Sequence, residues 1–241
     1  MKLWRLPNRP YLKMMNRMSK SLEFGDWPTA RHKPSAQWAV AILAILYLVG
    51  IVGILLPIHP DFILLTPVNL LVSVALVLAH HKPWTLRTVS YLLVAYAVGF
   101  GAELFGVQTG LLFGDYAYGE VLGPKVWGTP LMIGVNWLML GYCAGVASNH
   151  LLGESPFWIR GTLAALLMVG LDVLIEPVAM RFGFWSWEGD TVPLRNYLGW
   201  LAVAWPLELL FAYWHTSLRN KVALALFCLQ VAFFAALFIF G

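Results

Sequence analysis

Charged residues are scarce in this chain of 241 residues. Asp, Glu, Lys and Arg make up 12% of it, whereas 60% of the residues are hydrophobic, and the mean hydropathy is +0.72. A soluble domain carries about 25% charged residues, so this chain has too few to cover a surface that faces water. The composition therefore excludes a soluble enzyme, a disordered chain and a disulfide-stabilised scaffold, and it leaves a polytopic membrane protein. The length argues for one folded domain.

Cysteine and cofactor-binding motifs are equally scarce. The two cysteines, Cys143 and Cys228, lie inside apolar runs, where we expect both to be buried as small hydrophobic residues. The glycine-rich run GFG (99–101) has Leu104 in place of a third glycine and lies inside an apolar stretch, which indicates helix packing. The sequence contains no P-loop, no Cys-x-x-Cys pair and no nucleophile elbow, so we expect no cofactor.

Basic residues are concentrated near the N-terminus. The first 33 residues hold eight Lys or Arg against two acids, while the rest of the chain holds eight against ten. A nucleic-acid-binding protein spreads basic residues over a folded face, so no nucleic-acid partner is expected. Residues 1–35 are predicted to be a basic cytoplasmic tail that forms an amphipathic helix on an anionic lipid surface, or a solvated tail that only sets topology. The helix is indicated by apolar residues at helical spacing: Tyr11, Leu12, Met15, Met18 and Leu22.

Seven apolar windows are long enough to cross a membrane, which takes about 20 residues. They predict an all-α, polytopic integral membrane domain over residues 36–241. With the N-terminus inside, the inner segments carry 13 Lys or Arg and the outer segments carry three. This bias predicts a cytoplasmic N-terminus and a C-terminus outside. The expected transmembrane helices are 38–57, 62–79, 88–107, 130–148, 161–180, 197–214 and 222–240.

The middle of the chain contains a repeat. Residues 113–118 read FGDYAY and residues 182–187 read FGFWSW, and each segment is followed by Pro-Leu and, seven residues after the proline, by tryptophan. Each is also preceded by a glutamate inside a span, Glu103 or Glu176. Spans 3-4 and 5-6 are therefore predicted to form a parallel internal repeat with a binding site at its interface. Interfacial aromatic belts are the alternative, since they account for the Tyr and Trp residues without any site.

Carboxylates inside the spans are the main candidates for chemistry, because an ionisable group there is costly. Asp172 and Glu176 are four residues apart, which places them on one helix face, about 6 Å apart along the axis. Two carboxyls this close in a low dielectric do not both ionise cheaply, so one is expected to keep a proton and act as a general acid. Glu103 and Asp115 complete the predicted catalytic set, whereas Glu208 is expected to be structural.

Two other roles for polar residues remain open. Taken singly, Asp172 or Glu176 also fits a helix-packing contact to Arg181, Arg195 or Asn196. A scattered metal site would draw on four histidines at the inner ends of spans, but they lack the i, i+3 or i+4 spacing of a di-iron centre. Boundary residues that reach toward the interface explain them without a metal, so none is predicted: His80, His81, His150 and His215.

Three ordered segments resemble a known family. FGDYAYGEVLGPKVWGTP (113–130), DVLIEP (172–177) and VPLRNYLGW (192–200) are similar to signature segments of the carotenoid-1,2-hydratase family, the carotenoid biosynthesis proteins of the bisanhydrobacterioruberin hydratase and gamma-carotene hydratase type. The resemblance covers residues 100–200 closely and the flanking spans only by hydropathy. Two positions depart from the family pattern: Glu176 stands where Asp is usual, and Arg195 where a small polar residue is common.

The resemblance implies an enzyme that adds water across the terminal C=C bond of an acyclic carotenoid end, without a cofactor, to give a tertiary alcohol. The expected partners are an acyclic carotenoid of lycopene or gamma-carotene type, water and membrane lipid, and the expected location is the bacterial inner membrane. Such a hydration needs an acid that protonates the alkene, aromatic faces that stabilise the cation, and a held water. Beside the carboxylates, the candidate substrate-binding residues are Tyr116, Tyr118, Trp137, Trp185, Trp187, Arg195 and Asn196.

Two other functions stay open at this point. A carotenoid end-group cyclase or isomerase begins with the same protonation but excludes water. A non-enzymatic carotenoid- or proton-coupled carrier would use the carboxylates as a relay. Pigment mass separates the three, because a hydratase product gains one water, a cyclase product keeps its mass and a carrier changes no pigment.

Overall fold

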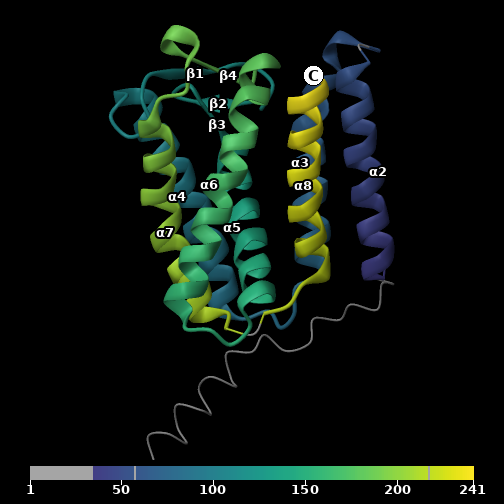
Figure 1. The fold of residues 1–241 in the computed structure, drawn as a ribbon, viewed down its shortest axis with the longest axis vertical. Helices are drawn as coiled ribbons and strands as arrows, with labels where there is room; N and C mark the ends of the chain where they lie inside the picture. The colour runs from purple at the N-terminus through teal and green to yellow at the C-terminus, as the bar shows by residue number, and fades with distance from the viewer. Residues whose placement is uncertain (1–34, 57, 217) are drawn as a thin grey trace, which may run out of the picture.

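The computed structural model describes residues 35–56, 58–216 and 218–241. The predicted tail lies outside these residues, apart from Ser35. Within them, seven α-helices run back and forth along one axis (Figure 1), which confirms the all-α prediction. They are α2 (Ala36–Leu55), α3 (Thr66–Ala79), which follows the short 3₁₀ helix η1 (Pro60–Leu65), α4 (Leu86–Thr109), α5 (Leu131–Leu152), α6 (Phe157–Arg181), α7 (Leu194–Trp214) and α8 (Lys221–Phe240).

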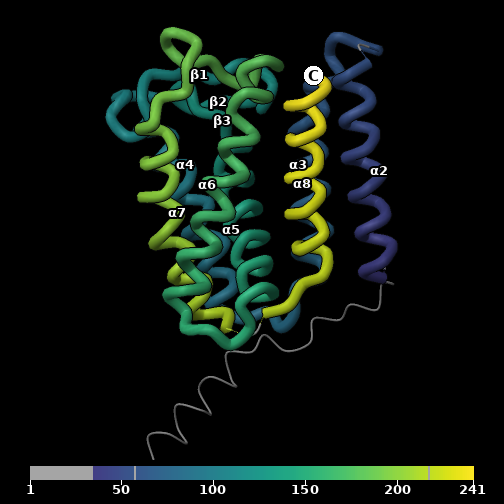
Figure 2. Tube along the Cα trace, in the orientation of Figure 1, coloured from purple at the N-terminus to yellow at the C-terminus, as the bar shows by residue number. Residues whose placement is uncertain are grey.

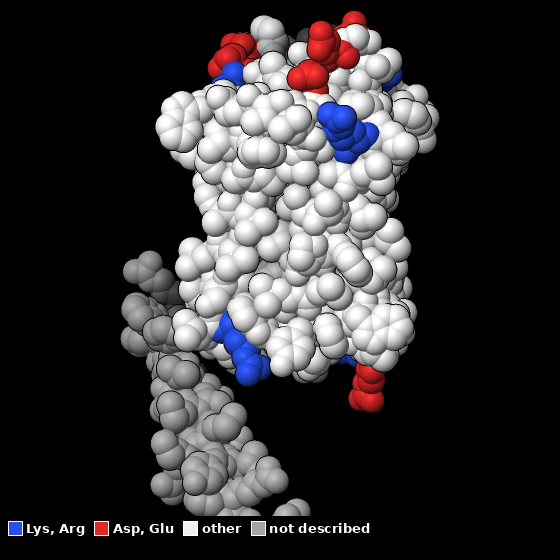
Figure 3. Space-filling view, turned by 90° about the vertical axis from the view of Figure 1, so that its left-hand side faces the viewer, with Lys and Arg blue, Asp and Glu red and all other residues white. Residues whose placement is uncertain are grey.

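The helices have the length and composition of an integral membrane protein. Six segments of the described chain qualify as membrane spans: α2, the combined η1–α3 segment Pro60–Ala79, α4, α5, α6 and α8. The remaining predicted span is α7, which has 21 residues and includes Arg195 and Glu208. On the face drawn in Figure 3, charged side chains gather at the two ends and leave an uncharged band between them. This band matches the apolar core of a bilayer.

Local sequence explains how several helices begin, end and approach one another. Helix α4 ends at Gly110, whose φ of 67° suits a residue without a Cβ atom. A Cβ atom at Gly99 would lie 2.3 Å from the Cβ atom of Trp137, so this glycine lets α4 and α5 pack closely, as expected for the GFG run. Three of the described α-helices begin with a side chain that accepts a hydrogen bond from a backbone N–H: Ser35 in α2, Thr85 in α4 and Asn220 in α8.

The helices form two groups that lie side by side. Helices α4, α5, α6 and α7 make one group, and α2, α3 and α8 stand beside it, with α8 in contact with both α5 and α6 (Figure 2). Cys143 in α5 is buried, as expected, but Cys228 in α8 is exposed. The prediction that Cys228 is buried is therefore wrong. Its apolar sequence surroundings did not reveal this, because the side of α8 that has no neighbouring helix is also apolar.

Two small sheets close one end of the bundle, called the strand end below; the other is called the opposite end. Strand β1 (Tyr116–Tyr118) pairs antiparallel with β4 (Trp185–Trp187), and β2 (Lys125–Val126) pairs with β3 (Thr129–Pro130). A short 3₁₀ helix, η2 (Glu188–Asp190), follows β4. The β1–β4 ladder joins the two loops of the predicted repeat, and the C-terminus also lies at this end (Figure 1).

The ladder brings together the two repeated segments of the sequence. Tyr116 faces Trp187 and Tyr118 faces Trp185, so the register is symmetric about the middle pair of the ladder. Trp137 and Trp200, which occupy matching positions after the prolines, stack on each other with ring centroids 4.3 Å apart. Both contacts join matching positions of α4–β1–α5 and α6–β4–α7, as expected for the predicted repeat.

Candidate functional site

A small chamber lies between the two halves of the repeat, next to the β1–β4 ladder. Its volume is about 20 Å³, which is room for one water molecule. Two buried carboxyl groups line it, Glu103 from α4 and Glu176 from α6. The other lining residues are aromatic, amide or aliphatic: Tyr116, Tyr118, Ile133, Asn136, Ile175, Trp185, Trp187, Asn196 and Trp200.

Glu103 accepts hydrogen bonds from three side chains. The hydroxyls of Tyr116 and Tyr118 both donate to its Oε2 at 2.7 Å, and Trp137 Nε1 donates to its Oε1 at 3.0 Å. The two tyrosines lie at alternate positions of β1, so their side chains point to the same side. Burial, together with the nearby Glu103, raises the pKa of both tyrosines well above its usual value, so they stay protonated.

Glu176 also accepts three hydrogen bonds. The indole Nε1 atoms of Trp185 and Trp187 both donate to its Oε2 at 2.8 Å, and Asn196 Nδ2 donates to its Oε1 at 3.0 Å. The same amide nitrogen donates to Asp172 Oδ2 at 2.9 Å. Asp172 and Glu176 therefore share one helix face, as predicted, and the contact to Asn196 weighed as a packing role is present as well.

Asp172 stands behind the chamber. It is fully buried, it is absent from the lining of the chamber, and its Oδ1 has no hydrogen-bond partner among the described residues. Its connection to the chamber runs through Asn196, which binds both acids. Asp172 is thus placed to act on Glu176 rather than on a ligand.

Two predicted site residues lie elsewhere. Asp115 is exposed before β1, where its backbone carbonyl, not its carboxylate, accepts a hydrogen bond from Glu188 N–H. Arg195 is exposed at the start of α7, with Nη1 3.5 Å from the carbonyl oxygen of Gly110. Neither side chain lines the chamber. A residue just beyond a span has water on one side, and sequence spacing does not determine which way it turns.

Aromatic rings surround the two carboxyl groups. Tyr116 and Trp187 lie with ring centroids 4.8 Å apart, and Tyr118 and Trp185 with centroids 5.8 Å apart. The π faces of such rings attract a cation, whereas their edges do not. Of the predicted substrate-binding residues, the structure gathers six around the carboxyls: Tyr116, Tyr118, Trp137, Trp185, Trp187 and Asn196.

The two halves of the repeat differ chemically at this site. Asp172 stands four residues before Glu176, whereas Gly99 stands four residues before Glu103. Asn196 follows its proline by three residues, and the matching position of the first half is Ile133. The second half therefore supplies an extra acid and an amide, so the two glutamates are not interchangeable.

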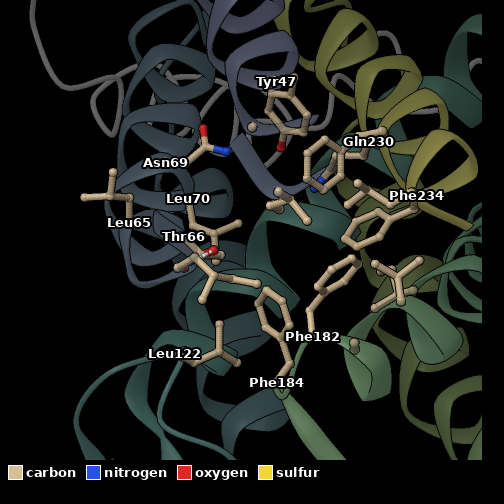
Figure 4. A pocket seen from close by; sticks show the side chains of 18 of the residues that line it. Tyr47, Leu65, Thr66, Asn69, Leu70, Leu122, Phe182, Phe184, Gln230 and Phe234 are labelled. Atoms are coloured by element: carbon tan, nitrogen blue, oxygen red, sulfur yellow. Dashed lines mark hydrogen bonds between the residues drawn. The ribbon is translucent and has the colours of Figure 1, made fainter. Parts of the chain in front are cut away.

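A larger apolar cavity of about 260 Å³ adjoins the chamber. Figure 4 shows phenyl and aliphatic side chains around it, and it lies between α2, α3 and α8 on one side and α5 and α6 on the other. Several of its lining residues are also exposed on the outside of the bundle, among them Val49 in α2 and Leu65 and Val68 near the start of α3. The cavity thus borders the apolar outer surface of the bundle.

Four residues line both the cavity and the chamber: Ile133, Asn136, Ile175 and Trp185. Asn136 and the cavity residues Asn69 and Gln230 are not among the site residues predicted from the sequence. Gln230 is 2% exposed and its Oε1 has no partner among the described residues. The signal available in the sequence is an amide inside an otherwise apolar span, which is weaker than that of a charge.

A second buried polar cluster lies at the opposite end and is separate from the chamber. Tyr91 donates to Glu208 Oε1 at 3.0 Å, which fits the structural role expected for Glu208. Thr88 Oγ1 lies 3.1 Å from His81 Nε2 and 3.2 Å from His215 Nε2. Burial lowers the pKa of His81 and lowers that of His215 to about 4, so both rings are neutral.

The structure also bears on the open question of a metal. Within the described residues, no group of three or more His, Cys, Asp or Glu side chains is placed to hold a metal ion. Of the four histidines at the ends of spans, His81 and His215 belong to the polar cluster, while His150 is exposed.

The family model described as "Carotenoid biosynthesis protein" matches residues 62–241. Bisanhydrobacterioruberin hydratase of Haloarcula japonica is 34% identical over 122 residues, which cover 47% of this chain and 41% of that protein. The match thus spans about two fifths of the length of this relative. No solved structure matches the chain.

Proposed function

This chain belongs to the carotenoid biosynthesis protein family, and on that premise we propose that it is a hydratase that adds water to the terminal C=C bond of an acyclic carotenoid end. One observation carries the proposal. Two buried carboxyl groups line a chamber with room for one water, and this chamber shares a wall with an apolar cavity that borders the apolar outer surface of the bundle. An acid, a base, a water and an apolar end group then meet at one point.

The proposed substrate is a carotenoid of lycopene or gamma-carotene type. Its end group occupies the cavity between the two helix groups, and the rest of the chain extends into lipid past Val49, Leu65 and Val68, which are exposed. The proposed location is the bacterial inner membrane with the N-terminus in the cytoplasm. The strand end, with the chamber beside it, then lies in the outer half of the bilayer.

The first step is proton transfer from Glu103 to the alkene. Glu103 is proposed as the acid because two of its partners, Tyr116 and Tyr118, are phenols, which accept hydrogen bonds as well as donate them. A proton on this carboxyl group is therefore compatible with its surroundings. The electron pair of the C=C bond takes the proton, and a tertiary cation forms beside the aromatic rings of β1 and β4.

The second step is the addition of water. The water oxygen forms the new C–O bond, and the proton that it loses passes to Glu176, so that alkene and water together give the tertiary alcohol. Glu176 is proposed as the base because all three of its partners are N–H groups, which only donate. Asp172 and Asn196 hold it in place. Return of the proton from Glu176 to Glu103 completes the cycle.

Pigment mass tests this proposal. The chain is expressed in a bacterium that accumulates lycopene, and the extracted pigments are analysed by mass spectrometry. We expect products heavier than lycopene by one water, or by two if both ends react. Pigments of unchanged mass but altered ring content would indicate a cyclase instead, and pigments identical to those of cells without the chain would indicate a carrier.

A further inference from the structure

We infer that Asn136 holds the water molecule that attacks the substrate cation, which makes it a positioning residue of the proposed hydration. The inference rests on the proposed function. Asn136 is a half-buried residue of α5 that lines both the chamber and the apolar cavity. A water in the chamber and an end group in the cavity come together at this position.

Asn136 has unused hydrogen-bonding capacity at this junction. Its side-chain amide makes no hydrogen bond with any described residue. Of the other junction residues, Ile133 and Ile175 are apolar, and the Trp185 N–H already donates to Glu176. An amide without a partner at membrane depth costs free energy, and a bound water supplies the missing partner.

The acceptor sites on Glu176 point to the same water. An ionised carboxylate has about four lone-pair sites, two on each oxygen. Trp185 and Trp187 fill those of Oε2, and Asn196 fills one on Oε1, which leaves one site on Oε1. A water that donates one hydrogen to this site and the other to Asn136 Oδ1 keeps its lone pairs for the cation. The volume of the chamber, about 20 Å³, admits one such water.

The arrangement makes a distinctive chemical prediction. Protonation of the alkene does not need the water, but formation of the C–O bond does. A cation that meets no water loses a proton to the Glu103 carboxylate from a carbon next to its positive centre, and the electron pair of that C–H bond forms the C=C bond of an alkene again. In D₂O the acid delivers a deuteron, so the recovered alkene carries deuterium. Loss of the Asn136 hydrogen bonds is therefore expected to reduce hydration, while the exchange of hydrogen for deuterium in the unhydrated pigment continues.

The experiment uses full-length protein in membrane vesicles supplied with lycopene in D₂O. Mass spectrometry measures two quantities, the hydrated pigment and the deuterium in the unhydrated pigment. Asn136→Leu keeps the side-chain size without the amide, and we expect it to lower hydration about tenfold or more while exchange changes by less than about twofold. Asn136→Asp keeps an acceptor oxygen and is expected to restore most of the wild-type ratio of hydration to exchange.

A matched control separates this role from a general effect on the cavity. Asn69→Leu removes an amide that lines the cavity but not the chamber, so the ratio of hydration to exchange should stay at its wild-type value even if turnover changes. A wild-type ratio of hydration to deuterium exchange in Asn136→Leu would overturn the inference. This holds whether hydration and exchange both continue or both decline. If the Leu variant does not accumulate in the membrane, Asn136→Ala provides the same comparison. Wild-type protein that yields neither hydrated nor deuterated pigment would overturn the proposed function itself, and the inference with it.

Discussion

The two glutamates of the chamber receive the same number of hydrogen bonds but from different kinds of donor. Glu176 is bound by two indoles and one amide, whereas Glu103 is bound by one indole and two phenols. N–H donors favour the ionised carboxylate, while phenols adapt to a carboxyl group with or without a proton. At the scale of single residues, this difference supports a division between an acid and a base.

Removing either transferable proton should abolish hydration. Glu103→Gln and Glu176→Gln keep the shape of the side chain but not the proton, and loss of a general acid or base typically costs about 10²–10⁴ in rate. The control is Asp115→Asn, which changes an exposed carboxylate outside the chamber and should hydrate at nearly the wild-type rate. The ratio of hydrated to unhydrated pigment at equal protein level is the measurement. Normal hydration by both Gln variants would show that the active site lies elsewhere.

Acidic pH should lower the stability of the protein through the buried histidines at the opposite end of the bundle. The pKa of His215 is lowered to about 4, chiefly by burial and further by the neighbouring His81 and Arg87, while histidine in an unfolded chain titrates near about 6.5. Between these values the unfolded state binds more protons, so stability is full above about pH 6.5 and is lost as the pH falls toward about 4. We expect the unfolding temperature to fall by several degrees from about pH 7 to about pH 5.

Two variants assign this pH dependence to its source. His215→Asn removes the titrating ring and should flatten the change in unfolding temperature between the two pH values. His150→Asn changes an exposed histidine and should leave the dependence unchanged. An equally steep fall in the His215 variant would show that other groups carry the effect.

The sequence predicted much of the site because helical spacing is rigid. Asp172 and Glu176 share a face, since residues four apart on a helix always do. Asp115 and Arg195 lie outside the chamber because both are exposed, Asp115 in the loop before β1 and Arg195 in the first turn of α7, which the predicted span 197–214 did not include. Asn136 was missed for another reason. A neutral amide inside a span is a weak signal until the two cavities that it joins are known.

At the scale of secondary structure, the β1–β4 ladder is what turns two repeated loops into one site. Its alternation aims Tyr116 and Tyr118 at Glu103, and Trp185 and Trp187 at Glu176. Strands of three residues are too short to be recognised from propensity alone, so the sequence predicted that a repeat exists without predicting how its halves pair. The spans were predictable because each needs a long apolar run, and all seven are helices.

A cross-link across the ladder tests this register. Ala117 faces Ser186, and both are exposed. Cβ atoms of directly opposed residues lie about 4.5–5.5 Å apart, close to the separation that a disulfide needs. In a Cys228→Ser background, the pair Ala117→Cys with Ser186→Cys should cross-link on oxidation and keep hydration activity.

The mismatched pair serves as the control for this cross-link. Ala117→Cys with Thr191→Cys moves one partner five residues beyond the facing position and should remain reduced under the same conditions, as judged by mobility on a gel without reductant. Equal cross-linking of both pairs would mean that the loops are not held in this register.

At the scale of the whole molecule, function depends on the space between two helix groups. The repeat in α4–α7 supplies the carboxyls, whereas α2, α3 and α8 supply the far wall of the apolar cavity (Figure 4). Hydropathy predicted each of these helices but not which of them pack together, because every membrane helix presents an apolar surface and lipid competes equally for it. The cavity is therefore a property of the assembled bundle.

The orientation of the bundle is the remaining prediction at this scale. Five basic residues lie in the described loops and helix ends of the opposite end, and three lie at the strand end. With the basic N-terminal segment, the positive-inside rule predicts that the opposite end faces the cytoplasm. A membrane-impermeant maleimide applied to intact cells should label Asp115→Cys, at the strand end. It should label Glu154→Cys, which is exposed at the opposite end, only after the membrane is opened. Both variants are made in a Cys228→Ser background, and the remaining Cys143 is buried. Because the chamber lies near the strand end, the reverse pattern would place the chemistry in the cytoplasmic half of the bilayer and would contradict the proposed topology.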